Sequence, residues 1–221
     1  MTKKLLVAGG TGRTGRIIVQ KWLALGQQPR VLARDLAAAR GLLGEQPDLV
    51  QGDVRDPVSL RPALEGCQVL ICAIGSRAPV GPNCPQHVDY EGVANLVDAA
   101  QAADVERFIL ISSIAVTQPN HPMNHFGKVL HWKREGERRL EASGLAFTIL
   151  RPGGLTHTPG NARQLIFDRG DRISGTIGRS DLAEACLRAV DHPASARATF
   201  ELVEDQAKGP PDWERLFAGL V

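Results

Sequence analysis

The stretch Val7–Gly26, VAGGTGRTGRIIVQKWLALG, decides the fold. Gly9, Gly12 and Gly15 recur at three-residue spacing between an apolar run and a segment of helical periodicity. Glycine lets a backbone turn tightly and approach a ligand, and the start of the following helix presents free N–H groups to an anion. A tight turn between a strand and a helix needs only one glycine, so three at this spacing favour a dinucleotide-binding loop.

Outward from this loop, short apolar runs alternate with longer amphipathic segments. Strands are predicted at 4–8, 30–33, 48–51, 69–73, 106–113, 145–152 and 198–203. Helices are predicted at 12–25, from Leu36 onward, and at 56–64, 88–103, 127–142, 180–190 and 210–220. This alternation predicts an α/β fold with a doubly wound, mainly parallel sheet, and residues 1–221 are treated as one domain.

Proline and glycine concentrate in three segments, 77–86, 118–122 and 153–160. Each segment follows the carboxyl end of a predicted strand, the edge at which sheets of this kind bind ligands. We therefore expect a substrate region formed by about 77–87, 117–126 and 153–178.

Composition and charge exclude several classes of function. The 26 basic and 24 acidic residues give a net charge of +2 and form no basic stripe, which argues against nucleic acid binding. The four cysteines and six histidines show no metal-ligand spacing, so no metal site is expected, and Cys67 and Cys72 are predicted to be buried apolar residues. No stretch approaches the roughly 20 apolar residues of a membrane span. A soluble, reduced, cytoplasmic protein is expected.

The end of the second predicted strand, VLARD, bears on the choice of dinucleotide. Arginine at this point fits the 2′-phosphate of NADP, whereas an acidic residue fits the 2′-hydroxyl of NAD. Arg34 stands there, and Arg13 in the glycine loop offers a second guanidinium, so NADP(H) is predicted over NAD(H). A surface role for Arg34 and a helix-capping role for Asp35 remain alternatives. Asp53 is expected to meet the adenine amino group, or else to be a turn residue.

Four motifs carry a family resemblance: GGTGRTG, GDVRD, ISS, and the run from Lys133 to Leu155 that ends in RPGGL. Together they resemble the atypical branch of the short-chain dehydrogenase/reductase superfamily. More narrowly, they are similar to small NAD(P)H-binding proteins related to NmrA-like regulators and to biliverdin and flavin reductases. The stretch NHPMN…WKREGERRLEASGLAFTILRPGGL is similar to chloroplast NADP-binding members. The resemblance covers essentially the whole chain and implies a Rossmann-like domain with a small C-terminal substrate region.

The glycine loop and the resemblance together predict the cofactor contacts. They are Gly9, Thr11, Gly12, Arg13, Thr14, Gly15, Arg34, Asp53, Val54, Ala73, Ile74, Gly75, Ser112, Lys133, Pro152, Gly153, Gly154 and Leu155.

The catalytic pattern of the superfamily is incomplete in this chain. Active members carry Tyr-x-x-x-Lys, in which the lysine holds the ribose and lowers the pKa of a proton-donating tyrosine. Lys133 aligns with the lysine, but Val129 stands in place of the tyrosine, and the only tyrosine, Tyr90, is out of register. Ser113 aligns with a substrate-facing hydroxyl.

Histidines offer a substitute proton donor at neutral pH. His157 and His121 are the preferred candidates, with exposed loop histidines as the plain alternative. The candidate catalytic residues are therefore Ser113, Lys133 and His157.

Two classes of function fit these observations. The first is an NADPH-dependent reductase of a flavin, a quinone or a similar electron-poor aromatic acceptor, which does not need the tyrosine. The second is a non-catalytic NADP(H)-sensing regulator that acts on a protein partner. A nucleotide-sugar epimerase or dehydratase is disfavoured by the missing tyrosine.

Overall fold

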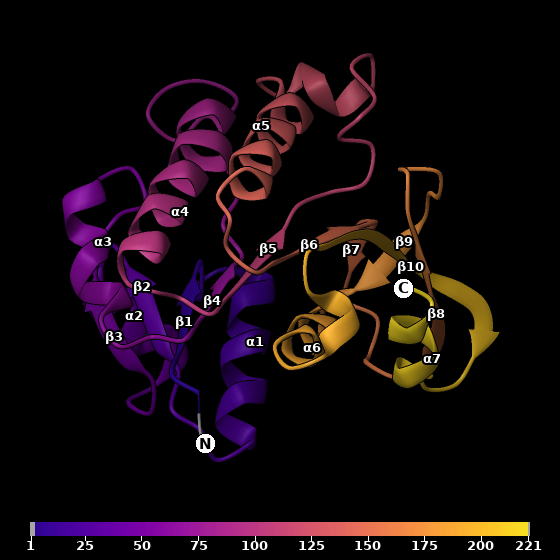
Figure 1. Ribbon diagram of the computed structural model, residues 1–221, viewed down its shortest axis with the longest axis horizontal. Helices are drawn as coiled ribbons and strands as arrows, with labels where there is room; N and C mark the ends of the chain where they lie inside the picture. The colour runs from indigo at the N-terminus through magenta and orange to yellow at the C-terminus, as the bar shows by residue number, and fades with distance from the viewer. Residues whose placement is uncertain (1–2, 221) are drawn as a thin grey trace.

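Eight strands form one sheet in the order β3-β2-β1-β4-β5-β6-β10-β8 in the computed structural model, which describes residues 3–220 (Figure 1). Neighbouring strands run parallel except β8, which pairs antiparallel with β10. Strands β7 and β9 form a separate parallel pair. The strands are β1 Leu5–Ala8, β2 Arg30–Ala33, β3 Asp48–Gln51, β4 Val69–Cys72, β5 Arg107–Ile111, β6 Phe147–Pro152, β7 Gly154–Thr156, β8 Arg163–Asp168, β9 Thr176–Gly178 and β10 Ala198–Lys208.

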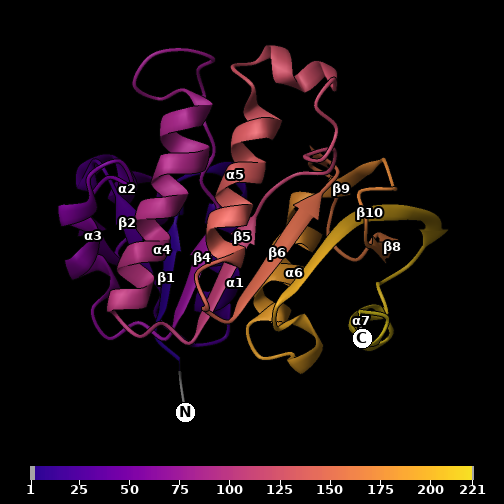
Figure 2. The ribbon, with the colours of Figure 1, turned by 45° about the horizontal axis from the view of Figure 1, so that its top comes forward.

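Helices cover both faces of the sheet. Helices α3, α4 and α5 pack on one face, and α1, α6 and α7 pack on the other (Figure 2). The helices are α1 Arg13–Ala24, α2 Leu36–Leu43, α3 Pro57–Leu64, α4 Gly92–Ala102, α5 Val129–Glu141, α6 Arg179–Ala189 and α7 Trp213–Ala218. Three shorter elements are the π-helix η1 Gln86–Glu91 and the 3₁₀ helices η2 Pro122–His125 and η3 Pro193–Ser195.

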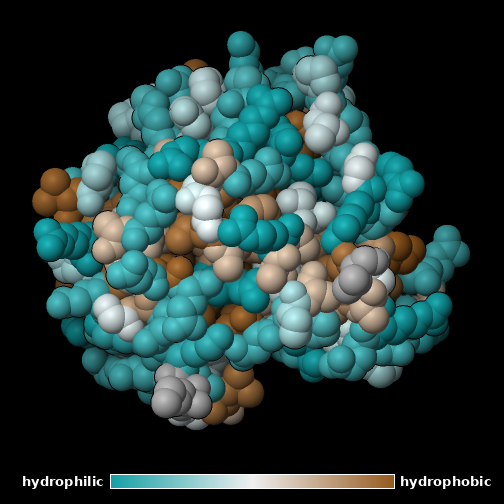
Figure 3. All heavy atoms as spheres, in the orientation of Figure 1, coloured by the Kyte–Doolittle hydropathy of each residue, from teal (hydrophilic) through white to brown (hydrophobic). Residues whose placement is uncertain are grey.

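The two faces of the sheet carry separate hydrophobic cores. In β1, Leu5 and Val7 join the core beneath α1 and α6, whereas Leu6 and Ala8 join the core beneath α3 and α4. This division follows from the alternation of side chains along a strand, and burial of both faces explains why β1 is apolar throughout. On the outer surface, hydrophilic residues predominate, and hydrophobic ones gather in a band across the middle of the face in Figure 3.

The predicted doubly wound α/β fold is confirmed, and each strand predicted from the sequence forms. The structure adds β7, β8 and β9, which lie within or next to the segment predicted only as a substrate loop. Strands β7 and β9 have three residues each, too few to show an alternating pattern. The C-terminal helix also forms, with Trp213 and Phe217 buried.

The cysteines are free thiols. Cys67, Cys72 and Cys186 are buried, as predicted for the first two, and Cys84 is half-buried. Burial raises the pKa of the Cys72 thiol to about 12. Within residues 3–220, no helix combines the length and the hydropathy needed to cross a membrane.

Candidate functional site

The glycine loop joins β1 to α1 and packs against the end of β4. Gly9 has a φ of +85°, and a Cβ on it would lie 2.6 Å from the carbonyl oxygen of Ala73. A Cβ on Gly15 would lie 2.1 Å from the carbonyl oxygen of Gly9. A Cβ on Gly12 would contact only that same oxygen, at 3.1 Å. Gly9 and Gly15 are therefore required by the protein's own backbone, whereas Gly12 is crowded by a single carbonyl oxygen.

The start of α1 presents an anion-binding end. Gly12 is the N-cap residue and has no side chain with which to cap the helix, and the first turn carries no acidic residue. The N–H groups of the first turn have no acceptor within a helix, and the helix dipole makes this end positive. Thr14 and Gly15 lie in this turn. The loop therefore fits a phosphate group in shape and in charge.

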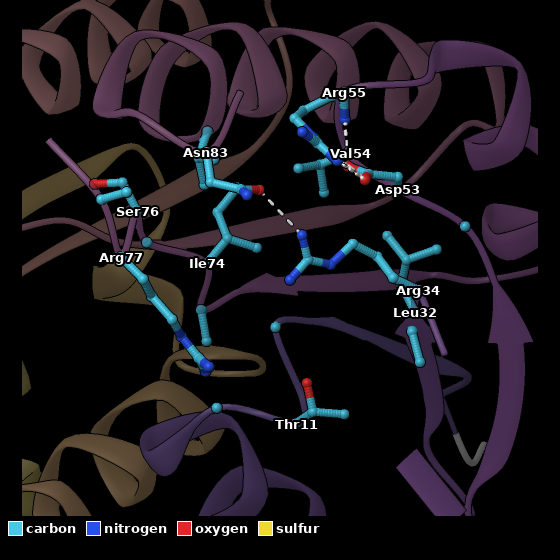
Figure 4. Close-up of a pocket in the computed structure, with 18 residues that line it drawn as sticks. Thr11, Leu32, Arg34, Asp53, Val54, Arg55, Ile74, Ser76, Arg77 and Asn83 are labelled. Atoms are coloured by element: carbon cyan, nitrogen blue, oxygen red, sulfur yellow. Dashed lines mark hydrogen bonds and ion pairs between the residues drawn. The ribbon is translucent and has the colours of Figure 1, made fainter. Parts of the chain in front are cut away.

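A cavity of about 270 Å³ opens in front of this loop, at the carboxyl ends of β1, β2, β3 and β4 (Figure 4). Several predicted cofactor contacts line it, namely Gly9, Thr11, Gly12, Arg34, Asp53, Val54, Ala73, Ile74 and Gly75. The strand order reverses between β1 and β4, and open α/β sheets bind their ligands at such a point.

Arginine side chains dominate the charge of this cavity. Arg34, Arg55 and Arg77 line it, and Asp53 is the only acid among the described residues that do so. Arg34 and Arg77 extend into the cavity from opposite sides in Figure 4, and Arg34 Nη1 donates to Asn83 Oδ1 at 3.1 Å. Arg55 and Arg77 were not predicted, although Arg55 lies within the GDVRD motif and Arg77 begins a predicted ligand loop.

Asp53 is bound by Arg55. The Arg55 Nε donates to both carboxylate oxygens of Asp53, at 3.0 and 3.2 Å, and the Arg55 backbone N–H donates to Oδ1 at 3.0 Å. The Arg55 guanidinium lowers the pKa of the Asp53 carboxyl. Asp53 is thus a turn residue that also lines the cavity. Asp35 accepts from the backbone N–H of Ala38 at 2.9 Å, so its helix-capping role is confirmed.

A second, much smaller cavity of about 10 Å³ lies beside Ile74. Ser112, Lys133 and Asp89 line it. Lys133 Nζ lies 2.8 Å from Asp89 Oδ1, as an ion pair, with side chains only 17% and 1% exposed. The buried hydroxyl of Ser112 has no hydrogen-bond partner among residues 3–220. Asp89 was not predicted, and sequence spacing carries no signal for a pair so far apart along the chain.

Val129 is the first residue of α5 and lies one turn before Lys133. Its side chain is buried in a small cluster with Ala115, Val116 and Leu130. An apolar side chain therefore fills the position at which the superfamily pattern has its tyrosine. The ring of Tyr90 stacks on Trp132, with centroids 5.7 Å apart.

Several predicted residues lie away from the main cavity. Arg13 is exposed and does not line it. Pro152 ends β6, and Gly154 and Leu155 belong to β7. A Cβ on Gly153 would lie 2.4 Å from the carbonyl oxygen of Gly175, so strand packing accounts for this glycine.

The remaining catalytic candidates are not brought together. Ser113 is half-buried next to Ser112, whereas His157 is exposed in the segment after β7. His121 Nδ1 accepts from the backbone N–H of Met123 at 3.3 Å and so caps η2.

The sequence is similar to a known protein family and to individual proteins of plants. Residues 9–193 match the profile of a family described as NAD(P)H-binding. The chain is 30% identical to sanguinarine reductase of Eschscholzia californica, over 100% of this chain and 97% of that protein. It is 32% identical to an uncharacterized chloroplastic protein of Arabidopsis thaliana, over 98% of this chain and 75% of that protein.

Solved structures share the fold. The anaerobilin reductase ChuY of Escherichia coli O157:H7 superimposes with a TM-score of 0.79 at 22% identity, over 93% of this chain and 98% of that chain. A short-chain dehydrogenase/reductase of Veillonella parvula in complex with NADP gives a TM-score of 0.75 at 17% identity, over 94% of this chain and 97% of that chain.

The relatives correct the expected cytoplasmic location. The Arabidopsis thaliana relatives at 32% and 33% identity are both chloroplastic proteins. The prediction was wrong because it rested on composition and cysteine usage, whereas a compartment is specified by targeting signals that the fold does not encode.

Proposed function

Because the chain belongs to the NAD(P)H-binding family, we propose that it is an NADPH-dependent reductase. The proposed acceptor is a flavin, a quinone or a similar electron-poor aromatic ring. Among the relatives, sanguinarine reductase is a reductase by name, and so is ChuY among the structures of the same fold. The cofactor would supply the hydride when bound, and the protein would supply binding and orientation.

The charge of the main cavity supports the preference for NADPH. The N-terminus of α1 and the loop at Gly12 would hold the pyrophosphate. Arg34, at the end of β2, would hold the 2′-phosphate through its guanidinium, with Arg77 on the opposite side of the cavity. A neutral 2′-hydroxyl would leave these cations without an anion to balance them.

The nicotinamide end is proposed to lie toward Ser112, Ser113 and Lys133. A lysine ammonium and a serine hydroxyl are suitable donors to a ribose hydroxyl or a carboxamide oxygen. Lys133 and the unpartnered hydroxyl of Ser112 face the same small cavity, which agrees with this role. His157 is a weaker candidate for the proton donor, because its side chain is exposed.

The burial of Val129 is the observation that carries the choice of acceptor. Reduction of a ketone to an alcohol needs an acid close to the developing alkoxide, and valine cannot supply a proton. A quinone or flavin spreads the incoming charge over its ring system and can take its proton from water. The same absence of an acid favours the second candidate, a sensor that binds NADP(H) without turning it over.

The cofactor preference is tested with Arg34→Ala. Loss of one charge-assisted contact should weaken NADPH binding by about 10- to 100-fold, while NADH binding should change by less than about threefold. Dissociation constants from nicotinamide fluorescence provide the measurement. Arg40→Ala is the matched control, because Arg40 is an exposed arginine of α2 that pairs with Glu45 and does not line the cavity. Equal losses for both dinucleotides would contradict the assignment.

Turnover separates the reductase from the sensor. Purified protein and NADPH are offered flavins, quinones and ketones while the absorbance of the reduced nicotinamide is followed. Steady oxidation with flavins or quinones, and none with ketones, is the expected result. Tight binding of NADPH without oxidation on any acceptor would replace the reductase with the sensor.

A further inference from the structure

Asp89 joins three separate parts of the site. It belongs to the π-helix η1, and its side chain is 1% exposed. Its Oδ2 accepts from the backbone N–H of Ser76, in the loop after β4, at 3.0 Å. Its Oδ1 lies 2.8 Å from the ammonium of Lys133 in α5. One buried carboxylate therefore links the loop that borders the main cavity to the lysine of the second cavity.

Asp89 is the counter-ion of Lys133. The charged and titratable groups that act on this lysine are Asp89 from η1, Cys72 from β4 and Glu137 from its own helix. Glu137 is already paired with Arg134 and Arg151, and the Cys72 thiol stays protonated because burial raises its pKa to about 12. Other residues around the second cavity, such as Ile111 of β5 and Val93 of α4, are uncharged. Removal of Asp89 would leave a largely buried cation with no free carboxylate.

Two opposing effects act on Lys133. Burial lowers the pKa of a lysine, because it disfavours the charged form. The Asp89 carboxylate is the largest influence in the opposite direction, Cys72 and Glu137 add to it, and the pKa of Lys133 lies above its ordinary value. An ammonium held in this way is a poorer acid than a free lysine, but it remains a good hydrogen-bond donor, with three N–H groups.

We propose that Asp89 is a positioning residue that keeps Lys133 charged and aimed into the cavity beside Ser112. Lys133 then serves as a fixed donor to a cofactor hydroxyl and does not replace the missing tyrosine as the acid. The cofactor part of this inference rests on the proposed function. The pairing itself concerns only the chain's own residues, and a measurement without cofactor tests it.

Asp89→Asn removes the charge and keeps the shape of the side chain. In the wild type, the raised pKa of Lys133 gives stability that is fully present below the unfolded pKa of about 10.4 and is lost as the pH rises through the folded pKa. In Asp89→Asn the lysine is buried without a partner, so its folded pKa falls below the unfolded value. The variant is then penalised at pH 7, and the penalty is relieved as the pH rises toward 10.

The expected result is a melting temperature of Asp89→Asn that lies below that of the wild type at pH 7 and approaches it at pH 10. Lys133→Met should show the mirror image. It leaves Asp89 as a buried carboxylate, so its deficit should shrink as the pH falls from 7 toward 5. Asp98→Asn is the control, because Asp98 is an exposed aspartate of α4 that pairs with Arg139, and its effect should not depend on pH in either direction.

Two results would overturn the pairing: a deficit of Asp89→Asn that stays constant from pH 7 to 10, or one that persists unchanged in Asp89→Asn/Lys133→Met. If Asp89→Asn does not fold, the melting temperature of Lys133→Met between pH 7 and pH 5 decides whether the two residues are paired.

NADPH binding tests the proposed role of Lys133 as a donor to the cofactor. The wild-type dissociation constant should stay constant from pH 7 to 9, whereas that of Asp89→Asn should rise about tenfold as Lys133 loses its proton. Equal pH profiles of the dissociation constant for wild type and Asp89→Asn would refute the donor role of Lys133. A wild type that does not bind NADPH would refute the proposed function. In that case the melting temperatures would still decide whether Asp89 and Lys133 are paired.

Discussion

A Cβ atom at Gly15 would lie 2.1 Å from the carbonyl oxygen of Gly9, whereas one at Gly12 would meet that oxygen at 3.1 Å and nothing else within contact. The first distance is shorter than any carbon–oxygen contact that a folded protein tolerates. The second needs a shift of only a few tenths of an ångström. Residues at equal spacing in one motif are therefore not equivalent: the backbone excludes a side chain at Gly15, whereas Gly12 needs only a small adjustment to accept one.

We predict that Gly12→Val folds but no longer binds nucleotide. Gly12 has φ −76° and ψ 168°, an extended conformation that valine adopts readily, so the free energy of unfolding should fall by no more than about 1 kcal/mol. Its side chain would fill the space in front of the first turn of α1, where a phosphate would sit. Gly15→Ala should instead lose about 1–3 kcal/mol or more of stability. Urea unfolding and a nucleotide titration of both variants provide the measurement, and retained binding by Gly12→Val would count against the loop assignment.

At this scale the sequence predicts the residues that carry motifs and misses their partners. Gly12, Arg34 and Asp53 could be named because each stands at a fixed place relative to a predicted strand end. Asp89 and Arg77 could not, because they reach the site through the path of the loop after β4. That path depends on tertiary packing, which no local spacing encodes.

At the scale of elements, a buried ionic cluster ties α5 to the sheet. Arg151 of β6 donates to both oxygens of Glu137 in α5, at 2.9 and 2.7 Å, and to Glu201 of β10 at 3.0 Å. Both carboxylates are fully buried, and Arg151 is nearly so. The cluster fixes the helix that carries Lys133 against two neighbouring strands. Each ion in it is stabilised only while its partners remain.

Arg151→Met should therefore destabilise the protein by about 3–5 kcal/mol, because it leaves the buried carboxylate of Glu201 without a cation and that of Glu137 with Arg134 alone. The exposed pair between Arg138 and Glu135, on the same helix, gives the comparison. Arg138→Ala should cost no more than about 1 kcal/mol. Chemical denaturation of both variants measures the difference. Similar decreases in the free energy of unfolding would show that the buried cluster stabilises the protein no more than the exposed pair does.

The main strands and helices could be predicted because each has its own apolar pattern. The edge strand β8 could not, since Arg163–Asp168 has no regular alternation and is held by its pairing with β10. The cluster around Arg151 was missed for a related reason. Glu137 stands among the charged residues of α5, and nothing in the sequence distinguishes it from its exposed neighbours. Only the packed structure shows that this part of α5 faces the sheet.

At the scale of the whole molecule, Asp171 connects the C-terminal third of the chain to the loop after β5. Its carboxylate accepts from the backbone N–H of Ala115 at 2.5 Å and of Thr117 at 3.0 Å, and from the Thr117 hydroxyl at 2.7 Å. Ala115 has a φ of +63°, a strained conformation for a residue with a side chain. The C-terminal segment thus holds in place the loop that leads from Ser113 to α5.

Asp171→Asn should release this loop. An amide has one acceptor oxygen in place of two, so at least one of the donors on Ala115 and Thr117 loses its partner, at a cost of up to about 1–3 kcal/mol. Hydrogen exchange at Ala115 and Thr117 should become faster than in the wild type. Asp168→Asn is the control, because Asp168 pairs with Arg172 near the surface and does not contact the loop after β5 through any hydrogen bond among the described residues. Unchanged exchange at both amides would contradict the role given to Asp171.

The same carboxylate predicts a dependence on acid. Burial alone would raise the pKa of Asp171, but the hydrogen bonds from Thr117 and Ala115 lower it overall. A lowered folded pKa contributes stability that is present above the unfolded value of about 3.9 and is lost as the pH falls through the folded pKa. Exchange at Ala115 and Thr117, corrected for the intrinsic rate, should therefore accelerate below about pH 4 in the wild type and show no such step in Asp171→Asn.

The four thiols differ in their accessibility to reagents in a way that should allow one of them to be labelled selectively. A thiol must ionise to react with an alkylating reagent, and Cys72 and Cys186 are buried with raised pKa values. Cys67 is buried as well, which leaves half-buried Cys84 as the accessible sulfur. It follows Asn83, the residue that meets Arg34 across the cavity. A maleimide dye should therefore couple at one place without any engineered cysteine, and its emission would report what enters the space next to it.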